Sequence, residues 1–255
     1  MGYFGNWFFV LCILSHGTVR AQVVNVEQTR LSTDTNAWTG KIDATLQYQN
    51  VNEKLTNAAA RAIAQYKSNK YFVLALTEYG YSGDNIVEYL NNAMFHLRYG
   101  YRVGSNTRIE AFHQIQRNTI IGIAHRSLNG FGPRFRLYRD SLLRIHVGTV
   151  AMFETERAIP GGPVETGVLN TDWRSSSYLN IQITQGMMEF SGTTYFQPLF
   201  HRPSDYRVSG QYSISIKVSK HLTLNQELTH YYDTDPPSSL TNRFLTYTMG
   251  MGYVF

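Results

Sequence analysis

The sequence has almost no cysteine. Its 255 residues include one, Cys12, which falls inside a segment that we expect to be removed. The mature chain then has no cysteine, and this excludes disulfides and thiol chemistry. Acylation of Cys12 is disfavoured as well, because a small residue usually precedes a lipidated cysteine and the residue here is Leu11.

Long apolar runs are also missing. After residue 21 no uninterrupted apolar segment approaches the ~20 residues that a membrane-spanning helix needs. Only helices and closed barrels satisfy the backbone in lipid, so any insertion into a membrane must be by strands. The chain has no basic run either, and its formal charge is a modest +5. We therefore expect no nucleic acid as a partner.

The sequence offers little to a metal or a cofactor. The eight histidines are scattered, with no close pair at ligand spacing. Gly130 and Gly132 lack the strand-to-helix context and the lysine of a phosphate-binding loop. Asp233 and Asp235 are two acids beside a proline pair, which is ordinary for a surface loop and does not define a calcium site. We expect neither metal nor cofactor.

Residues 1–21 are typical of a cleaved secretory signal. An apolar run from Trp7 to Leu14 is followed by small residues at Val19 and Ala21, which suit a cleavage site before Gln22. No lysine or arginine precedes the run, which departs from the usual pattern. The alternative is an N-terminal anchor, but the run is far shorter than the ~20 residues of a spanning helix. The sequence therefore predicts export.

The rest of the chain has a dominant hydrophobic period of two. Leu143, Ile145 and Val147, for example, alternate with Arg144 and His146. Such alternation predicts strands that have one apolar and one polar face, and about ten residues suffice to cross a bilayer when the strand is tilted. The predicted strands are 38–50, 55–67, 70–80, 87–102, 106–118, 122–139, 142–155, 172–184, 187–198, 204–218, 221–233 and 242–255.

These strands predict an all-β protein: a transmembrane, antiparallel, up-and-down β-barrel of about 12 strands that occupies residues 38–255 as one domain. The alanines of 55–67 favour a helix locally, but the neighbouring segments all indicate strands. Residues 22–37 are left outside the wall, as a periplasmic or luminal segment, because bacterial barrels have an even strand number. A soluble lipocalin-like barrel, with its apolar residues inside, is the alternative fold.

The connections between the predicted strands alternate in length. Tight polar turns are expected at 68–70, 104–106, 139–141, 185–186 and 219–220, and longer connections around 83–84, 156–171, 201–204 and 235–238. Short turns at one end and long loops at the other are typical of an outer-membrane barrel. Counting back from the C-terminus assigns every short turn, and both chain ends, to the periplasmic side.

The last strand carries the most specific local pattern. Tyr247, Met249, Met251, Tyr253 and Phe255 form an apolar face that ends on a terminal aromatic residue. This face resembles the assembly signal of outer-membrane barrels and implies the barrel-assembly machinery as a partner during biogenesis. The alternative is an exposed edge of a soluble sheet, which would be an aggregation hazard.

Several segments together resemble a family of salt-induced outer-membrane proteins of unknown function, sometimes described as porins. The segments that carry the resemblance, in order, are Val24–Glu27, Asn91–Ala93, His96–Tyr99, Glu110–Gln116, Gly130–Phe135, Thr194–Pro198, Asp205–Arg207 and Tyr232–Asp233. The resemblance covers most of the mature chain. It implies a porin-like barrel in the outer membrane, in contact with outer-membrane lipid, and it implies no particular chemistry.

If the apolar face of each strand points outward, the alternate residues line the lumen. The candidates are Lys41, Asp43, Arg61, Arg98, Arg102, Glu110, Arg126, Arg134, Arg136, Arg144, Glu189, Arg207, Lys217 and Glu227, together with Glu154 and Asp205. The basic side chains are in excess, and a pore with such a lining favours anions. A lumen of intermediate width is equally compatible with charges that pair with one another and fill it.

We therefore expect a small passive channel of the outer membrane with a weak preference for anions. A plugged barrel with a structural or loop-mediated binding role is the alternative. A lipid hydrolase is a third possibility, because His125, Ser127 and Asn129 share one face of a strand, but the wider motif of such an enzyme is missing and we expect no enzyme. The sequence predicts neither the solute nor the oligomeric state.

Overall fold

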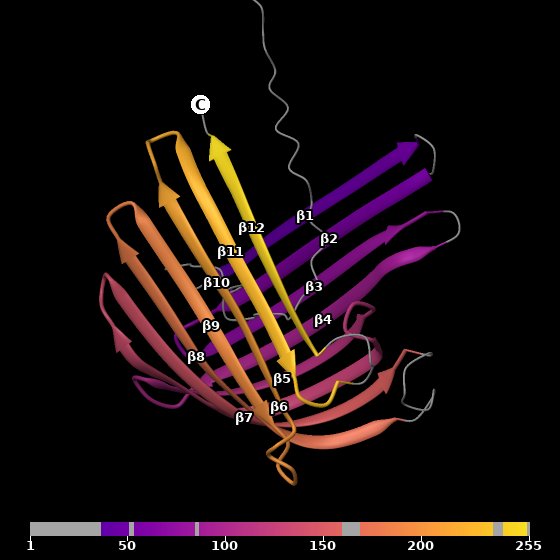
Figure 1. The fold of residues 1–255 in the computed structure, drawn as a ribbon. Coiled ribbons are helices and arrows are strands. Elements are labelled where there is room, and N and C mark those ends of the chain that lie inside the picture. The colour runs from indigo at the N-terminus through magenta and orange to yellow at the C-terminus, as the bar shows by residue number, and fades with distance from the viewer. Residues whose placement is uncertain (1–36, 51–53, 85–86, 160–168, 237–241, 254–255) are drawn as a thin grey trace, which may run out of the picture.

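The structure, a computed structural model, describes residues 37–50, 54–84, 87–159, 169–236 and 242–253. The predicted signal peptide, nearly all of the 22–37 segment and the terminal Phe255 lie outside these ranges. The described residues form strands joined by turns and loops (Figure 1). No helix in this part of the chain is long and apolar enough to cross a membrane, a finding that concerns helices alone.

The described chain forms a single sheet in which each strand pairs with the next, from β1 to β12. All of these pairs are antiparallel. The all-β, up-and-down prediction and the number of strands are confirmed. The strands are β1 (Ala37–Asn50), β2 (Lys54–Lys67), β3 (Tyr71–Gly83), β4 (Glu88–Arg102), β5 (Thr107–Asn118), β6 (Ile123–Arg139), β7 (Leu143–Ala158), β8 (Asn170–Gln185), β9 (Met188–Pro198), β10 (Tyr206–Lys217), β11 (Leu222–Asp233) and β12 (Arg243–Tyr253).

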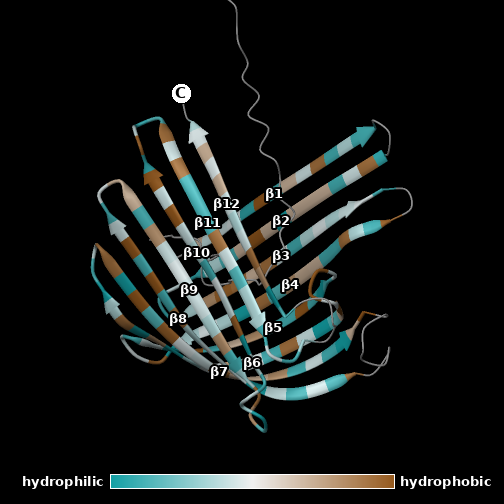
Figure 2. Cartoon of the chain, viewed as in Figure 1, coloured by the Kyte–Doolittle hydropathy of each residue, from teal (hydrophilic) through white to brown (hydrophobic). Residues whose placement is uncertain are grey.

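The alternating apolar and polar residues of the sequence lie on opposite faces of this sheet. In β7 the side chains of Met152, Glu154 and Glu156 are buried on one face, while Ala151 and Arg157 are exposed on the other. Figure 2 shows hydrophobic and hydrophilic residues alternating along most strands. Because successive side chains point to opposite faces, the sheet has an inward face and an outward face.

The sheet curls on itself (Figure 1), with β1–β4 on one side, β9–β12 on the other and β5–β8 between them. The pairing runs from β1 to β12 and, among the described residues, does not join these two strands to each other. β1 and β12 are accordingly the most exposed strands, on both of their faces. The described sheet is strongly curved and open at this seam.

The two ends of the sheet differ in their connections. At one end, called the turn end, the strands are joined through 68–70, 103–106, 140–142, 186–187 and 218–221. At the other, called the loop end, the longest connections are 159–169, 199–205 and 234–242. The connection near Gly83 is shorter than expected, because β3 continues to Gly83 and leaves only 84–87 before β4.

The inward face is not uniformly polar. Ile63, Phe72, Leu74, Leu76 and Met94 form a buried apolar cluster on β2, β3 and β4. We expected polar residues on this face, and the sequence of β3 explains the difference. Its segment Tyr71–Leu76 is apolar at both parities, so one apolar row necessarily points inward.

Candidate functional site

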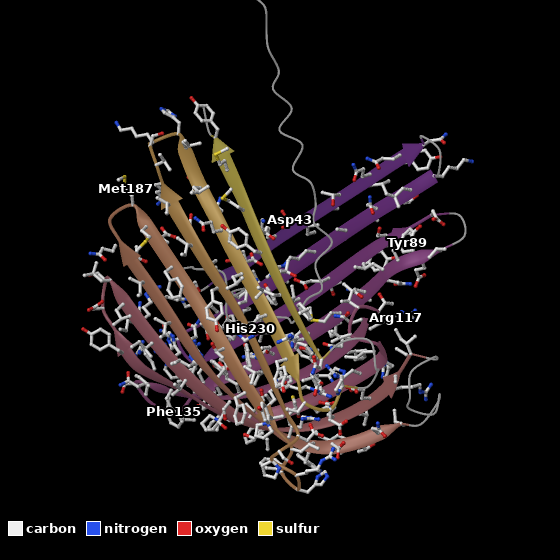
Figure 3. All side chains as sticks on the ribbon, in the orientation of Figure 1. Asp43, Tyr89, Arg117, Phe135, Met187 and His230 are labelled. Carbon is white, nitrogen blue, oxygen red and sulfur yellow. The ribbon has the colours of Figure 1, made fainter. Side chains whose placement is uncertain are left out.

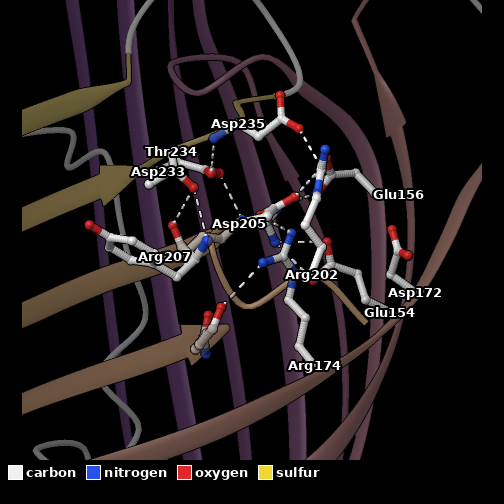
Figure 4. Close-up of polar contacts among 12 residues, drawn as sticks. Glu154, Glu156, Asp172, Arg174, Arg202, Asp205, Arg207, Asp233, Thr234 and Asp235 are labelled. Carbon is white, nitrogen blue, oxygen red and sulfur yellow. Dashed lines mark hydrogen bonds and ion pairs between the residues drawn. The ribbon is translucent and has the colours of Figure 1, made fainter. Parts of the chain in front are cut away.

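The loop end is held by a network of buried charges centred on Arg207 of β10. Its Nη1 donates to Glu154 Oε1 at 2.7 Å, and its Nε donates to Asp233 Oδ2 at 2.7 Å. Its Nη2 reaches Glu156 Oε2 at 3.3 Å. Arg207, Glu154, Glu156 and Asp233 are each no more than 5% exposed. One guanidinium therefore joins acids from β7 and β11 (Figure 4).

Two further arginines extend the network to β6 and β8. Arg126 of β6 donates to Glu156, and its Nε lies 3.8 Å from Glu154. Arg174 of β8 has its Nε 3.6 Å from Glu154, and its Nη2 donates to Asp205 Oδ1 at 3.0 Å. Glu154 thus faces three guanidinium groups, a set of contacts that offsets the cost of burying its charge.

At the rim, Arg202 bridges two loops of the loop end. Its Nη2 donates to Asp205 Oδ2 at 2.7 Å and to Asp235 Oδ2 at 2.6 Å. The hydrogen bond with Asp205, together with that to Asp235, raises the pKa of Arg202 above its usual value. We call the set the loop-end network; its members are Arg126, Arg174, Arg202, Arg207, Glu154, Glu156, Asp205, Asp233 and Asp235. With four arginines and five carboxylates, its charge is nearly balanced.

Apolar side chains also make contact across the inside of the curved sheet, next to the loop-end network. Tyr231 of β11 is buried against Ile121, in the turn before β6, and Ile123, the first residue of β6, and Phe244 of β12 packs against the same cluster. The hydroxyl of Tyr231 donates to Asp233 Oδ2 at 2.8 Å. β6 and β11 are not neighbours in the sheet, so these side chains meet across the inside of the curved sheet.

The remaining predicted lumen residues lie outside this network, and most of them are paired. Arg98 contacts Glu110 at 3.2 Å, and Arg134 approaches the same carboxylate at 4.0 Å. At the more exposed positions the pairs are Lys41 with Asp43 at 2.8 Å, Arg61 with Glu78 at 3.0 Å, and Lys217 with Glu189 at 3.5 Å, while Glu227 accepts from Gln211 Nε2 at 2.8 Å.

Arginines without a carboxylate partner gather at the turn end. Within the described ranges no ion pair involves Arg102, Arg136, Arg139 or Arg144. Arg136 instead donates to the backbone oxygen of Ser105 at 2.6 Å and to Asn106 Oδ1 at 2.9 Å. The inward charges are thus joined in one network at the loop end, whereas the turn end combines isolated pairs, such as Lys217 with Glu189, with these four arginines.

Five network residues were not among the predicted lumen residues, and one of them, Arg202, lies in the 199–205 connection and not on a strand. Arg174 lies on the same, inward face of β8 as Tyr178. The residues between them, Ser175 to Ser177, are all polar, so the sequence does not show there which face is inward. Glu156 lies beyond the predicted end of its strand at 155, whereas β7 runs to Ala158. Asp233 and Asp235 were considered only as calcium ligands; they bind Arg207 and Arg202, and the described residues hold no cluster of three or more metal-ligand side chains.

The candidate hydrolase residues lie on β6. Asn129 Oδ1 is 2.8 Å from Nδ1 of His113, on the neighbouring strand β5. The amide that was expected to orient His125 is therefore engaged by another histidine. The hydrogen bonds of the described residues include none between His125 and Ser127.

Two of the cavities formed by the described residues lie along the inward face. One has a volume of about 320 Å³ and is lined by residues of β1–β5 and by Glu227, among them Asp43, Arg61 and Glu78. The other measures about 90 Å³ and lies against β4–β11, and its lining includes Arg98, Arg134 and Tyr178 as well as the network residues Arg126 and Arg207. Charged side chains line both of these cavities.

A family model matches residues 42–255 of the chain, and the chain belongs to that family, described as "Protein of unknown function, DUF481". The description assigns no activity and does not mention salt induction. No curated protein matches the chain significantly.

Among solved structures, the chain is similar to the NanC porin at 7% sequence identity and a TM-score of 0.47, over 86% of this chain and 98% of that one. It is also similar to the siderophore receptor PirA from Pseudomonas aeruginosa (10% identity, TM-score 0.42, 87% of this chain and 47% of that one). A bacterial polysaccharide outer membrane secretin is a further similar structure (10% identity, TM-score 0.43, 85% and 91%). Similarity at this level says nothing of a ligand or a mechanism.

Proposed function

We propose that this protein is an outer-membrane β-barrel whose lumen is closed by the loop-end network. The membrane part of the proposal is supported by the outward face. Ile42 and Leu46 of β1 are 80% and 76% exposed, and Met249 of β12 is 63% exposed. Large exposed side chains of this kind also occur on β4, β6, β8 and β9. A soluble monomer rarely exposes so large an apolar surface.

Aromatic residues near both ends of the outward face fit two membrane interfaces. Toward the turn end, the ring of Trp38 lies 5.2 Å from that of Tyr66. Toward the loop end, the ring of Trp173 lies 5.2 Å from that of Phe153. On this proposal the turn end faces the periplasm, and β1 closes the barrel by pairing with β12.

The single observation that carries the closed lumen is the contact of Arg207 with Glu154, Glu156 and Asp233 in the interior of the sheet. Opening a path for solutes here would separate buried opposite charges, which is costly once one partner is left alone. The lumen is then a filled interior with small cavities. This supports a structural barrel, or one that binds its ligand without conducting it.

A small channel with a weak preference for anions is the second candidate. It is favoured by the unpaired arginines of the turn end, since rings of basic side chains select anions. Under this candidate the loop-end network is a gate instead of a permanent plug.

We also propose that Tyr247, Met249, Met251 and Tyr253, which share the outward face of β12, act with Phe255 as the signal read by the assembly machinery. A catalytic role is no part of the proposal, and the salt-induced behaviour implied by the family resemblance stays a prediction.

Solubility of the refolded mature chain tests the membrane proposal. We expect a folded species only in detergent or lipid, with a gel mobility that changes on heating because the closed sheet resists unfolding. A monodisperse, folded species in detergent-free buffer would contradict the proposal. It would instead favour a soluble β-protein.

A further inference from the structure

The outward face of β5–β8 carries polar side chains in the middle of the wall. His113 of β5 and Asn129 of β6 are cross-strand partners, and Nδ1 of the histidine lies 2.8 Å from Oδ1 of the asparagine. Thr149 of β7 and Ser177 of β8 are also cross-strand partners, and their hydroxyl oxygens lie 2.9 Å apart. Ser127 lies two residues from Asn129 and therefore on the same face of β6. We call these five residues the outer polar patch.

The burial of neighbouring residues places the patch on the outward face. Gln114, Leu128 and Tyr178, each next to a patch residue along its strand, are buried on the inward face. Asn129 and Thr149 are themselves exposed. Because side chains alternate between the two faces, the patch points away from the lumen.

The patch lies at the depth of the hydrocarbon if the sheet spans a membrane. Apart from Ser127, its residues are at least five residues from either end of their strands. At a rise of ~3.3 Å per residue they lie well inside an apolar band that is ~25 Å tall. Within the described ranges the side chain of Asn129 bonds to His113 alone, and the hydroxyl of Ser127 has no hydrogen bond. Polar groups without a partner are costly in lipid, so a polar partner within the membrane would stabilise the patch.

A second outward polar group, on β9–β11, differs because its members bond to one another. The hydroxyl oxygen of Tyr212 lies 2.7 Å from Thr194 Oγ1 and 3.3 Å from Nε2 of His230. Figure 3 shows His230 well apart from Phe135, which belongs to β6 with Asn129. The outer polar patch is thus separate from this group, and it keeps polar atoms that no neighbour uses.

The surface around the patch is self-complementary in shape. Phe131 of β6 is 63% exposed, and its cross-strand neighbours are Ala111 of β5 and Ala151 of β7. The ring therefore projects between two small residues, as a knob beside two hollows. A two-fold axis brings the same surface of two copies together, so the knob of each copy can fill a hollow of the other.

The depth of the patch indicates what covers it. Lipids present acyl chains at this level, and an acyl chain offers no hydrogen-bond donor or acceptor. A second copy presents the same amide, imidazole and hydroxyl groups at the same depth, and these groups both donate and accept. The patch contains no acid, lysine or arginine, so two patches meet without repulsion. β5–β8 also lie opposite the seam between β1 and β12 (Figure 1), so contact there leaves closure of the barrel unaffected.

We propose that the outer polar patch, together with Phe131, is the interface through which two copies of this chain associate side by side in the outer membrane. Hydrogen bonds between the two patches satisfy the polar atoms that lipid would leave without a partner. The inference rests on the proposed function, because the patch faces lipid only if the sheet forms a membrane barrel.

Cysteine crosslinking in phosphatidylcholine vesicles, at a low ratio of protein to lipid, tests where two copies meet. Residues 22–255 contain no cysteine, so an introduced cysteine is the only thiol of the refolded mature chain. We expect a flexible bismaleimide to join Ala151→Cys into a dimer and to leave Ala60→Cys monomeric. Ala60 of β2 is the matched control, because it is also an exposed alanine near the middle of its strand. Equal crosslinking of the two variants would overturn the inference.

Energy transfer between donor-labelled and acceptor-labelled copies in the same vesicles measures the strength of association. We expect Phe131→Ala to weaken it by about tenfold or more, because aromatic residues dominate interfaces. Phe95→Ala is the control, because Phe95 is an exposed phenylalanine in the middle of β4, and we expect no change. Asn129→Leu is expected to weaken association by about three- to tenfold with no loss of folding stability, since leucine suits lipid in the separated copies.

A folded wild type that gives no energy transfer would overturn the inference, and so would an Asn129→Leu variant that associates as tightly as the wild type. An assembly of more than two copies would contradict the two-fold contact. Heat-dependent gel mobility verifies that each variant is folded. Failure of the membrane proposal is distinguishable, because the chain would then be folded in buffer alone.

Discussion

The two ends of the lumen use the same residue type in opposite ways. At the loop end Arg126, Arg174 and Arg207 are buried, and each lies within 4 Å of at least one carboxylate. At the turn end the side chains of Arg102, Arg139 and Arg144 are exposed, and arginines lie opposite other arginines. The role of an inward arginine therefore depends on whether a carboxylate pairs with it, and not on the number of charges on the inward face. On the proposed function, the loop end is the plug of the lumen and the turn end is its charged mouth.

The largest effect is expected from breaking the plug. Arg207→Ala leaves Glu154 and Asp233 buried without their main partner, and we expect a loss of about 3–5 kcal/mol in the free energy of unfolding. Tryptophan fluorescence during urea unfolding in lipid vesicles measures this loss.

Arg202→Ala is the control for that experiment. Arg202 belongs to the same network, but its side chain is 55% exposed, so we expect at most about 1 kcal/mol. Equal losses for the two variants would mean that burial does not distinguish the core of the network from its rim.

A substitution at the turn end is expected to stabilise the protein instead of destabilising it. Arg139→Gln relieves the repulsion between Arg139 and Arg144, and we expect it to raise the free energy of unfolding by about 0.2–1 kcal/mol at low salt. The gain shrinks at high salt, because salt screens exposed charges. The same urea titration at two salt concentrations measures it. A destabilised Arg139→Gln variant would show that Arg139 has a stabilising partner.

The smallest effect concerns the turn that follows β6. The pKa of Asp140 is held below its usual value, first by the backbone hydrogen bond from Leu143 and then by the hydroxyl of Tyr138. A carboxyl whose pKa is lowered by folding contributes stability above its unfolded pKa and loses it as the pH falls through the folded value. We therefore expect Asp140→Asn to be slightly less stable than the wild type at neutral pH.

This difference between Asp140→Asn and the wild type shrinks below about pH 4, the range of an unperturbed aspartate. Unfolding midpoints measured between neutral and acidic pH follow it. A difference that stays constant across that range would show that the charge of Asp140 plays no part in the turn.

Much of the fold could be predicted because the alternation of apolar and polar residues is a direct record of the two faces of a strand. Even the alanines of β2 follow their neighbours, since pairing with β1 and β3 overrides local helix propensity. The ends of the strands were harder to predict. The extension of β7 to Ala158 brought Glu156 into the network, although a prediction that ended the strand at 155 had left it in a loop.

The partners of the lumen charges could not be predicted from alternation. Parity assigns Arg207 and Arg102 to the same face, but it does not say that Arg207 meets Glu154 from a strand that is not its neighbour. The register of β6 with β7 also shifts between Arg136 and Tyr138, so that Arg139 pairs with the inward Arg144. Simple alternation does not predict such a shift, and Arg139 was not among the predicted lumen residues. Long-range contact and register shifts depend on the curvature of the whole sheet, which no local pattern records.

Single-channel conductance of the refolded mature chain in a planar bilayer tests the closed lumen most directly. The account predicts a folded, membrane-inserted protein that gives no stable conductance steps, because the loop-end network stays paired. Stable steps, with a reversal potential shifted toward that of the anion in a salt gradient, would contradict the plug and establish the anion-preferring channel instead.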